Sequence, residues 1–262
     1  MSIFTKRGAE AVTAATTEEE EAKESILVPF NSGTTYKVRV KSVDDSAEYY
    51  AYGIFGKVNT FVPANPSERN AKGFVTANPT VWDRAADLLY KDAKALKDAG
   101  KTAEAEKVAQ QAYLFKGKPR YLMAFGNLET GEDIAIDLTK KQASGVMATI
   151  NKYAKKIDKM AFELSKTGSS TSTVVTLSPI IDMDEDLTDE ERANFEKCGE
   201  KPFDFANFED CLFVADEAEQ TKNLVVAGFD IGRLGLSIGA TTPADEEVTP
   251  ITEEGEDPTL QF

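Results

Sequence analysis

The segment YLFKGKPRY, residues 113–121, brings cationic and aromatic side chains together in one short stretch of the chain. Lys and Arg side chains can follow a phosphate backbone, and aromatic rings can stack on unpaired bases. The combination is therefore typical of surfaces that bind single-stranded nucleic acid. Packing of the rings in a folded core explains the cluster equally well. The candidate binding residues of this segment are Tyr113, Phe115, Lys116, Lys118, Arg120 and Tyr121.

The segment TTYKVRVKSV, residues 34–43, repeats the cationic half of this chemistry. Its apolar residues alternate with Lys37, Arg39 and Lys41, which is the two-residue period of a half-buried strand. The three cations would then share the outer face of that strand. We therefore add them to the candidate nucleic-acid-binding residues.

Residues 48–64 predict a second strand, in which Gly53 and Gly56 mark bends or bulges. A tyrosine in a strand more often packs half-buried than it serves as a base platform, so each ring here has two interpretations. The candidate stacking residues of this stretch and its candidate cation are Tyr49, Tyr52, Phe55 and Lys57.

Catalytic chemistry has little support in this composition. The chain contains no His, which is the usual general base and the commonest partner of Cys at zinc sites. Its two cysteines, Cys198 and Cys211, lack the basic neighbours that activate a thiol. The acidic run of residues 182–191 lacks the ligand order of a calcium loop, so a solvated surface is its better interpretation. We therefore expect a non-enzymatic protein without metal or cofactor.

The net charge of −15 would argue against a nucleic-acid partner, but the charges are segregated along the chain. Residues 31–180 contain 22 basic and 16 acidic side chains, whereas residues 181–262 contain 5 and 23. The pattern indicates a basic body with an acidic C-terminal region. Solubility alone is a simpler explanation of that region, although it does not account for the final Leu260, Gln261 and Phe262.

Helical signals flank the candidate residues on both sides. The spacing of apolar residues predicts a helical hairpin over residues 79–115, with Trp82 in the core. A long amphipathic helix is predicted over residues 140–166. It opens with Lys140 and Lys141, which we add to the candidate DNA-binding residues.

The strand signals indicate the fold class. Residues 118–139 predict a β-hairpin and residues 170–181 a further strand, while Thr188 and Glu191 form the pattern of a helix-capping box. With the two earlier strands, this order indicates an α+β, mainly β protein. We expect an OB-type barrel with an inserted helical hairpin and a long helix before the last core strand. Barrels of this type bind single strands without reading their sequence.

Three regions follow from the composition along the chain. Residues 1–25 form a flexible arm and linker, residues 26–239 the OB-type core, and residues 240–262 a disordered acidic tail. The apolar content of the tail is too low to offset the entropy cost of ordering it. No stretch reaches the roughly 18 apolar residues of a membrane span, so we expect a soluble, cytoplasmic protein.

The order of these segments resembles the helix-destabilising single-stranded DNA-binding proteins of T4-like phages over nearly the whole chain. The resemblance rests on the basic–aromatic strand, the hairpin, the helix after Lys140 and Lys141, the short N-terminal arm and the acidic end. It implies an OB-type core that coats and protects single-stranded DNA in viral replication, repair and recombination. It also implies a tail that recruits replication proteins, and cooperative self-association through the arm residues Phe4, Thr5, Lys6 and Arg7.

This chain departs from that family at the zinc subdomain, which uses three Cys and one His between early strands. The predicted helical hairpin occupies that position here, so the resemblance implies no zinc. The acidic end that closes on an aromatic residue is more similar to bacterial and T7-like single-stranded DNA-binding proteins. That similarity implies that Leu260, Gln261 and Phe262 bind partner proteins. From the opposite charges of tail and body, we expect the tail to compete weakly with DNA phosphates for the basic body.

Two other interpretations stay open. A non-catalytic interaction protein, such as a virion or scaffold component, would use the basic body to contact an acidic protein. An RNA-binding OB module would present the same surface chemistry to RNA.

Overall fold

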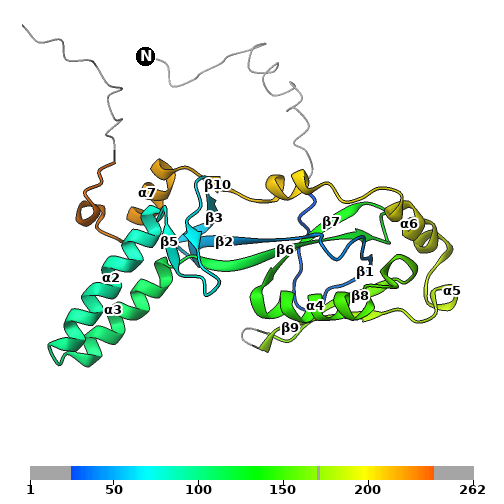
Figure 1. Cartoon of the computed structure of the whole chain (residues 1–262), viewed down its shortest axis with the longest axis horizontal. Helices are drawn as coiled ribbons and strands as arrows, with labels where there is room; N and C mark the ends of the chain where they lie inside the picture. The colour runs from blue at the N-terminus through cyan, green and yellow to red at the C-terminus, as the bar shows by residue number, and fades with distance from the viewer. Residues whose placement is uncertain (1–24, 170–171, 239–262) are drawn as a thin grey trace, which may run out of the picture.

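A computed structural model describes residues 25–169 and 172–238, which form an elongated molecule with a helical end and a sheet end (Figure 1). The predicted arm and acidic tail lie outside the described residues. The same holds for the residues to which self-association and partner binding were assigned, which are Phe4, Thr5, Lys6, Arg7, Leu260, Gln261 and Phe262.

One mostly antiparallel sheet of eight strands forms the body of the molecule. Its strands follow the order β10-β3-β2-β6-β1-β8-β9, and β7 pairs with β6 off this path. The strands are β1 (Thr35–Arg39), β2 (Ser46–Ile54), β3 (Val58–Pro63), β6 (Lys118–Asn127), β7 (Asp133–Thr139), β8 (Phe162–Thr167), β9 (Val174–Pro179) and β10 (Val214–Ala215).

The sheet stays open in the described part of the chain, because its two ends, β9 and β10, do not pair with each other. The predicted OB-type barrel is therefore not confirmed, and the fold is a mixed α+β architecture on an open sheet. The first half of β6 pairs with β2 and its second half with β1. The far end of β2 pairs with β3 and packs on helices, so it does not curl back towards β9.

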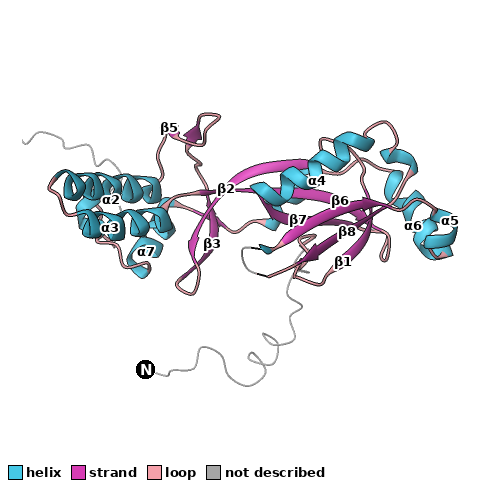
Figure 2. Cartoon of the chain, turned by 90° about the horizontal axis from the view of Figure 1, so that it is seen from below, coloured by secondary structure: helices cyan, strands magenta, loops and turns pink. Residues whose placement is uncertain are grey.

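Helices lie at both ends of the sheet and over one of its faces (Figure 2). None of those described is long and apolar enough to cross a membrane. At the helical end are α2 (Val81–Asp98), α3 (Thr102–Phe115) and α7 (Glu217–Val226); over the sheet is α4 (Lys140–Tyr153); at the opposite end are α5 (Met183–Asp186) and α6 (Asp189–Gly199). Short 3-10 helices span Ile157–Lys159, Phe205–Cys211 and Ile231–Leu234.

Several local predictions are confirmed. The α2–α3 pair is the predicted helical hairpin, and β6 and β7 form the predicted β-hairpin. The Thr188 side chain accepts a hydrogen bond from the Glu191 amide in the predicted capping box. Trp82 is fully buried, and its Nε1 donates to the Gln220 carbonyl at 3.0 Å.

The predicted helix over residues 140–166 is wrong beyond Tyr153. After that residue the chain makes a 3-10 turn and then enters β8, which pairs with both β1 and β9. Phe162 and Leu164 alternate with more exposed neighbours and are completely buried, which is the period of a strand. Two strands therefore follow the helix, where the sequence predicted one.

The predicted strand over residues 48–64 is a hairpin of β2 and β3 rather than a single element. Gly53 and Gly56 have φ angles of +136° and +74°, which glycine adopts without the penalty of a side chain. Gly53 therefore lies at an irregularity of the pairing within β2, and Gly56 lies in the turn, as the predicted bulge and bend positions suggested. A small hairpin of β4 (Glu68–Arg69) and β5 (Val75–Ala77), which the sequence did not predict, follows β3.

Two large hydrophobic cores share the long strands of the sheet. One lies under α4 and includes Phe125 of β6 and Phe162 of β8. The other lies at the helical end, where Phe61 and Phe115 pack around Trp82. A smaller cluster covers the sheet face opposite α4 and draws in the 3-10 helix Phe205–Cys211.

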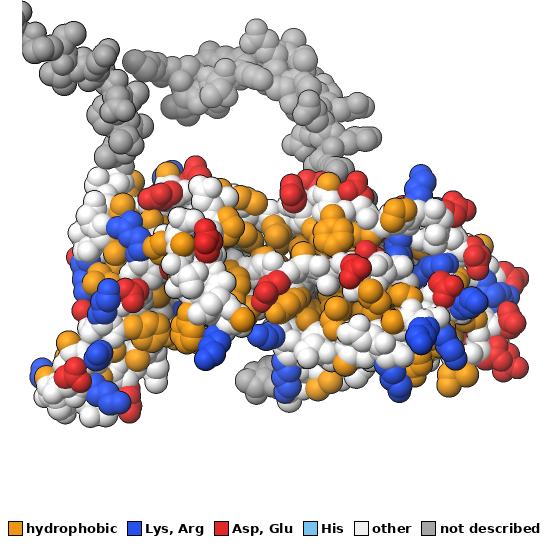
Figure 3. All heavy atoms as spheres, in the orientation of Figure 1, with side chains coloured by type: hydrophobic (Ala, Val, Ile, Leu, Met, Phe, Trp, Pro, Cys, Tyr) orange, Lys and Arg blue, Asp and Glu red, His pale blue; other side chains and the backbone are white. Residues whose placement is uncertain are grey.

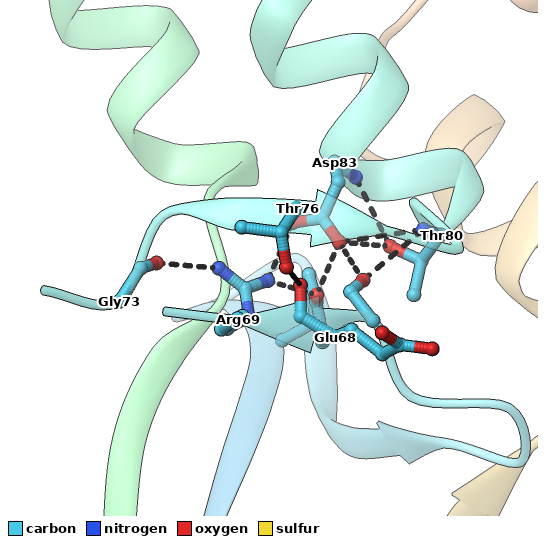
Figure 4. Close-up of polar contacts among 8 residues, drawn as sticks. Glu68, Arg69, Gly73, Thr76, Thr80 and Asp83 are labelled. Atoms are coloured by element: carbon cyan, nitrogen blue, oxygen red, sulfur yellow. Dashed lines mark hydrogen bonds and ion pairs between the residues drawn. The ribbon is translucent and has the colours of Figure 1, made fainter. Parts of the chain in front are cut away.

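A buried ion pair joins the β4–β5 hairpin to the start of α2 (Figure 4). Arg69 Nη2 lies 2.7 Å from Asp83 Oδ1, and both side chains are only 6% exposed. The hydroxyl of Tyr52 in β2 donates to Asp83 Oδ2 at 2.8 Å and accepts from Arg69 at 2.7 Å. Asp83 also completes the capping box of α2 with Thr80. One carboxylate therefore positions β2, β4 and α2 relative to one another.

Replacing Asp83 with Ala should lower the free energy of unfolding by about 3–5 kcal/mol, because the buried Arg69 loses its counter-charge. Asp87→Ala is the matched control on the same helix, since Asp87 pairs with Lys91 at an exposed site. The control should cost about 1 kcal/mol or less. Urea unfolding followed by circular dichroism measures both variants, and equal losses would contradict the positioning role of Asp83.

Candidate nucleic-acid interface

A cleft of about 650 Å³ lies between the β2–β3 hairpin, the start of β6 and residues 211–213. We call it the β2–β3 cleft. It brings together several predicted binding residues that are distant in sequence, and Lys57 lies in the β2–β3 turn beside it. The predicted residues that line it are Tyr49, Tyr52, Phe55, Lys118 and Arg120.

The pairing of β2 with β6 explains why these side chains meet. Tyr49 lies opposite Arg120, and Ala51 lies opposite Lys118. Directly paired residues of an antiparallel ladder project to the same side of the sheet. The alternation of both strands therefore places Tyr49, Lys118 and Arg120 on one face.

Exposed aromatic rings flank this basic line. Phe55 at the β2–β3 turn is fully exposed, and Phe213 is 56% exposed. Phe213 was missed in the sequence because it is distant from the other residues and lies within the short apolar run of residues 211–215, which has no neighbouring cation. It reaches the cleft through backbone pairing, in which the Phe213 carbonyl accepts a hydrogen bond from the Val62 amide at 2.8 Å.

The cations of the cleft differ in how much of their charge is already neutralised. Arg120 Nε donates to Asp137 Oδ1 at 3.0 Å. Burial disfavours the charged guanidinium, but the hydrogen bond and charge of Asp137 raise the pKa of Arg120, so it stays cationic. Burial, followed by the charge of Asp137, raises the pKa of Tyr49 and keeps its phenol neutral.

Lys57 and Lys118 form no ion pair with any described residue. The ammonium of Lys118 lies 5.3 Å from the ring centroid of Tyr113, which is itself 56% exposed. These two lysines are therefore the cations of the cleft that are free to meet a phosphate.

Two predicted binding residues belong to the core instead. Tyr52 is 3% exposed and Phe115 is 1% exposed, and both pack in the hydrophobic cluster at the helical end. Neither ring has a free face for a base in this conformation, so the stacking role predicted for them is corrected. Tyr52 still lies at the cleft wall, where it contributes shape rather than a platform.

The cationic face predicted for residues 34–43 is also corrected. All three of its cations already contact side chains of α6 or of the start of β7. Lys37 Nζ lies 3.0 Å from Glu191, and Lys41 Nζ lies 2.9 Å from Asp133. Arg39 stacks 4.1 Å from the ring centroid of Phe195. Figure 3 shows Lys and Arg side chains mixed with Asp and Glu at this end of the molecule.

The remaining candidates lie away from the β2–β3 cleft. Tyr121 packs against the core under α4, and its hydroxyl donates to Glu48 at 2.7 Å. Lys140 and Lys141 are exposed at the start of α4, directly after Thr139, which pairs with Arg120. Lys116 lines a second cleft.

Comparison with known protein families, with curated proteins and with solved structures finds no match to this chain. The resemblance to phage single-stranded DNA-binding proteins therefore stays a prediction from the sequence. Function has to be inferred from the geometry of the surface.

The burial of Tyr52 has a measurable consequence at high pH. Burial, followed by the charge of Asp83, raises the pKa of its phenol from 10 to about 12. As the pH rises from 10 to 12, the unfolded tyrosine ionises while the folded one stays neutral, so the contribution of Tyr52 to stability is lost. The Tyr52→Phe variant should show a shallower fall in Tm over this range. Identical slopes in wild type and variant would contradict the burial of this ring.

Proposed function

We propose that this protein binds single-stranded DNA without sequence preference through the β2–β3 cleft. The observation that carries the proposal is the placement of the exposed rings Phe55 and Phe213 beside Lys57 and Lys118, which have no counter-charge among the described residues. Base stacking on an aromatic ring contributes about 1–3 kcal/mol per base and tolerates every base. Lysines beside the rings add the sequence-independent phosphate term.

The open sheet is compatible with this activity. An OB-type barrel is one scaffold that presents rings and cations along a twisted hairpin, and the β2–β3 hairpin with β6 offers the same ingredients. In this proposal the protein binds single-stranded DNA stoichiometrically and does not act as an enzyme. It would coat unpaired strands and shift hairpins towards the unpaired state by mass action. A role in viral replication, repair and recombination is supported by the sequence resemblance alone.

Binding can be followed with a tryptophan placed at the proposed platform. Trp82 is fully buried, so the natural tryptophan is a poor reporter of stacking. In Phe55→Trp, stoichiometric oligo-dT should quench the new fluorophore, whereas duplex DNA should not. Parallel titration with oligo-rU distinguishes a DNA binder from an RNA binder. Absence of quenching at low salt would contradict the proposal and favour a protein-interaction role.

The two physical contributions can be separated by substitution. Phe55→Ala should raise the Kd for oligo-dT about fivefold or more through loss of stacking. Lys118→Gln should reduce the slope of log K against log salt concentration by about 0.7, since one phosphate contact is lost. Lys94→Gln on the exposed face of α2 and Ile181→Ala, 90% exposed near α5, are the matched controls. Variants indistinguishable from these controls would exclude the β2–β3 cleft as the binding site.

We also propose that the acidic C-terminal segment recruits replication proteins through Leu260, Gln261 and Phe262, with its carboxylates competing weakly for the basic cleft. Attraction of this kind is screened by salt. Deleting residues 241–262 should leave DNA affinity equal or tighter at low salt while abolishing capture of partner proteins. Gel-shift titration and pull-down measure the two effects, and severely weakened DNA binding would refute the competition.

A further inference from the structure

A second cleft, of about 580 Å³, lies between the β4–β5 hairpin and α2. We call it the hairpin cleft. Phe74 lines it from the hairpin and is 59% exposed, and Tyr90 lines it from α2 and is 39% exposed. The volume falls in the range of clefts that hold ligands of nucleotide size. Both walls therefore offer aromatic surface to a flat ligand.

The charges around the hairpin cleft favour an anionic ligand. The ammonium of Lys116 lies 5.6 Å from the ring centroid of Phe74, and Arg84 lines the same cleft. The two carboxylates of the lining are already neutralised, since Asp83 pairs with Arg69 and Asp87 pairs with Lys91. A ring with an adjacent cation is the pairing that a base and its phosphate would use.

Two lysines that are two positions apart in the chain line the two clefts. Lys116 lines the hairpin cleft, and Lys118 lines the β2–β3 cleft. Between them, Gly117 packs so closely that an added Cβ would lie 2.7 Å from the Tyr52 ring and 3.0 Å from Arg69. The buried ion-pair network thus packs against the backbone between the two lysines, which sets the spacing of their Cα atoms.

We propose that the hairpin cleft is a second base-binding site and that one DNA strand passes over Lys116–Lys118 to occupy both clefts. A base stacks on Phe74 and Lys116 contacts the neighbouring phosphate. The proposal rests on the function proposed for the β2–β3 cleft and extends the path of the strand. On this path the strand makes one line of phosphate contacts and stacks its bases on two aromatic platforms that lie apart from each other.

The test compares reporters in the two clefts with one oligo-dT of about 12 nucleotides, which is within the length that such surfaces cover. Phe74→Trp should be quenched at the same stoichiometry as Phe55→Trp. Phe74→Ala should raise the Kd about fivefold or more. Lys116→Gln should lower the salt slope by about 0.7, and Lys94→Gln and Ile181→Ala again serve as controls.

The outcomes distinguish this proposal from the proposed function. Quenching at Phe55→Trp with no response at Phe74→Trp, and control-like affinities for Phe74→Ala and Lys116→Gln, would overturn the second site and leave the first intact. Silence at both reporters would overturn both proposals. If Phe74→Ala unfolds, as judged by circular dichroism, Phe74→Trp and Lys116→Gln still decide the question.

Discussion

The buried contact between Arg69 and Asp83 is the constraint on which the surface of this molecule depends. Taking two charges out of water is costly, and removing one partner is costlier still than never having had the pair. Here further interactions of Asp83 offset part of this desolvation cost. Its carboxylate also caps α2 and accepts a hydrogen bond from the Tyr52 hydroxyl. Arg69 Nε has no hydrogen-bond partner among the described residues, which adds to the cost. Replacing the ion pair with apolar side chains would remove this desolvation cost, but it would also remove the polar contact that joins β4 to β2.

The arrangement also explains how a chain with a strongly negative net charge can present local positive sites. The basic excess of residues 31–180 does not form one continuous field, because Lys37 of β1 pairs with Glu191 of α6 and Lys41 pairs with Asp133 of β7. Two cations at or just before the start of β6, Lys116 and Lys118, lie near the rings of Phe74 and Tyr113. Their influence is short-ranged at physiological salt, where screening acts over about 8 Å. Contact geometry rather than a long-range field therefore determines what binds there.

Local patterns in the sequence predicted much of the secondary structure, and long-range contacts account for the errors. Caps and helical periodicity located α2 and α3, and the two-residue period located β1, because those signals need only neighbouring residues. The strand at Phe162–Thr167 was lost in an apparent helix, since a short apolar run fits both periods. Whether paired strands form a closed barrel or an open sheet depends on long-range pairing, which no pattern of neighbouring residues predicts.

The same distinction applies to the candidate site. Phe55 and Lys118 were predicted and meet in one cleft, because residue type and strand pairing agree there. Tyr52 has the same residue type as Tyr49, but the two residues are three apart in β2 and therefore project to opposite faces, and Tyr52 packs against Trp82. Phe74 and Phe213 carry no local signature, and their place at a cleft depends on contacts made far along the chain.

The long strands β2 and β6 determine how the molecule unfolds as well as which side chains it presents at its surface. β2 contributes Tyr52 to the core at the helical end and Ala47 to the cluster opposite α4, while β6 serves that cluster and the core under α4. If the chain were divided between the helical end and the sheet end, neither part would keep a complete hydrophobic core. The described body should consequently melt as one cooperative unit and resist dissection by limited proteolysis, with no autonomous fragment to be expressed alone.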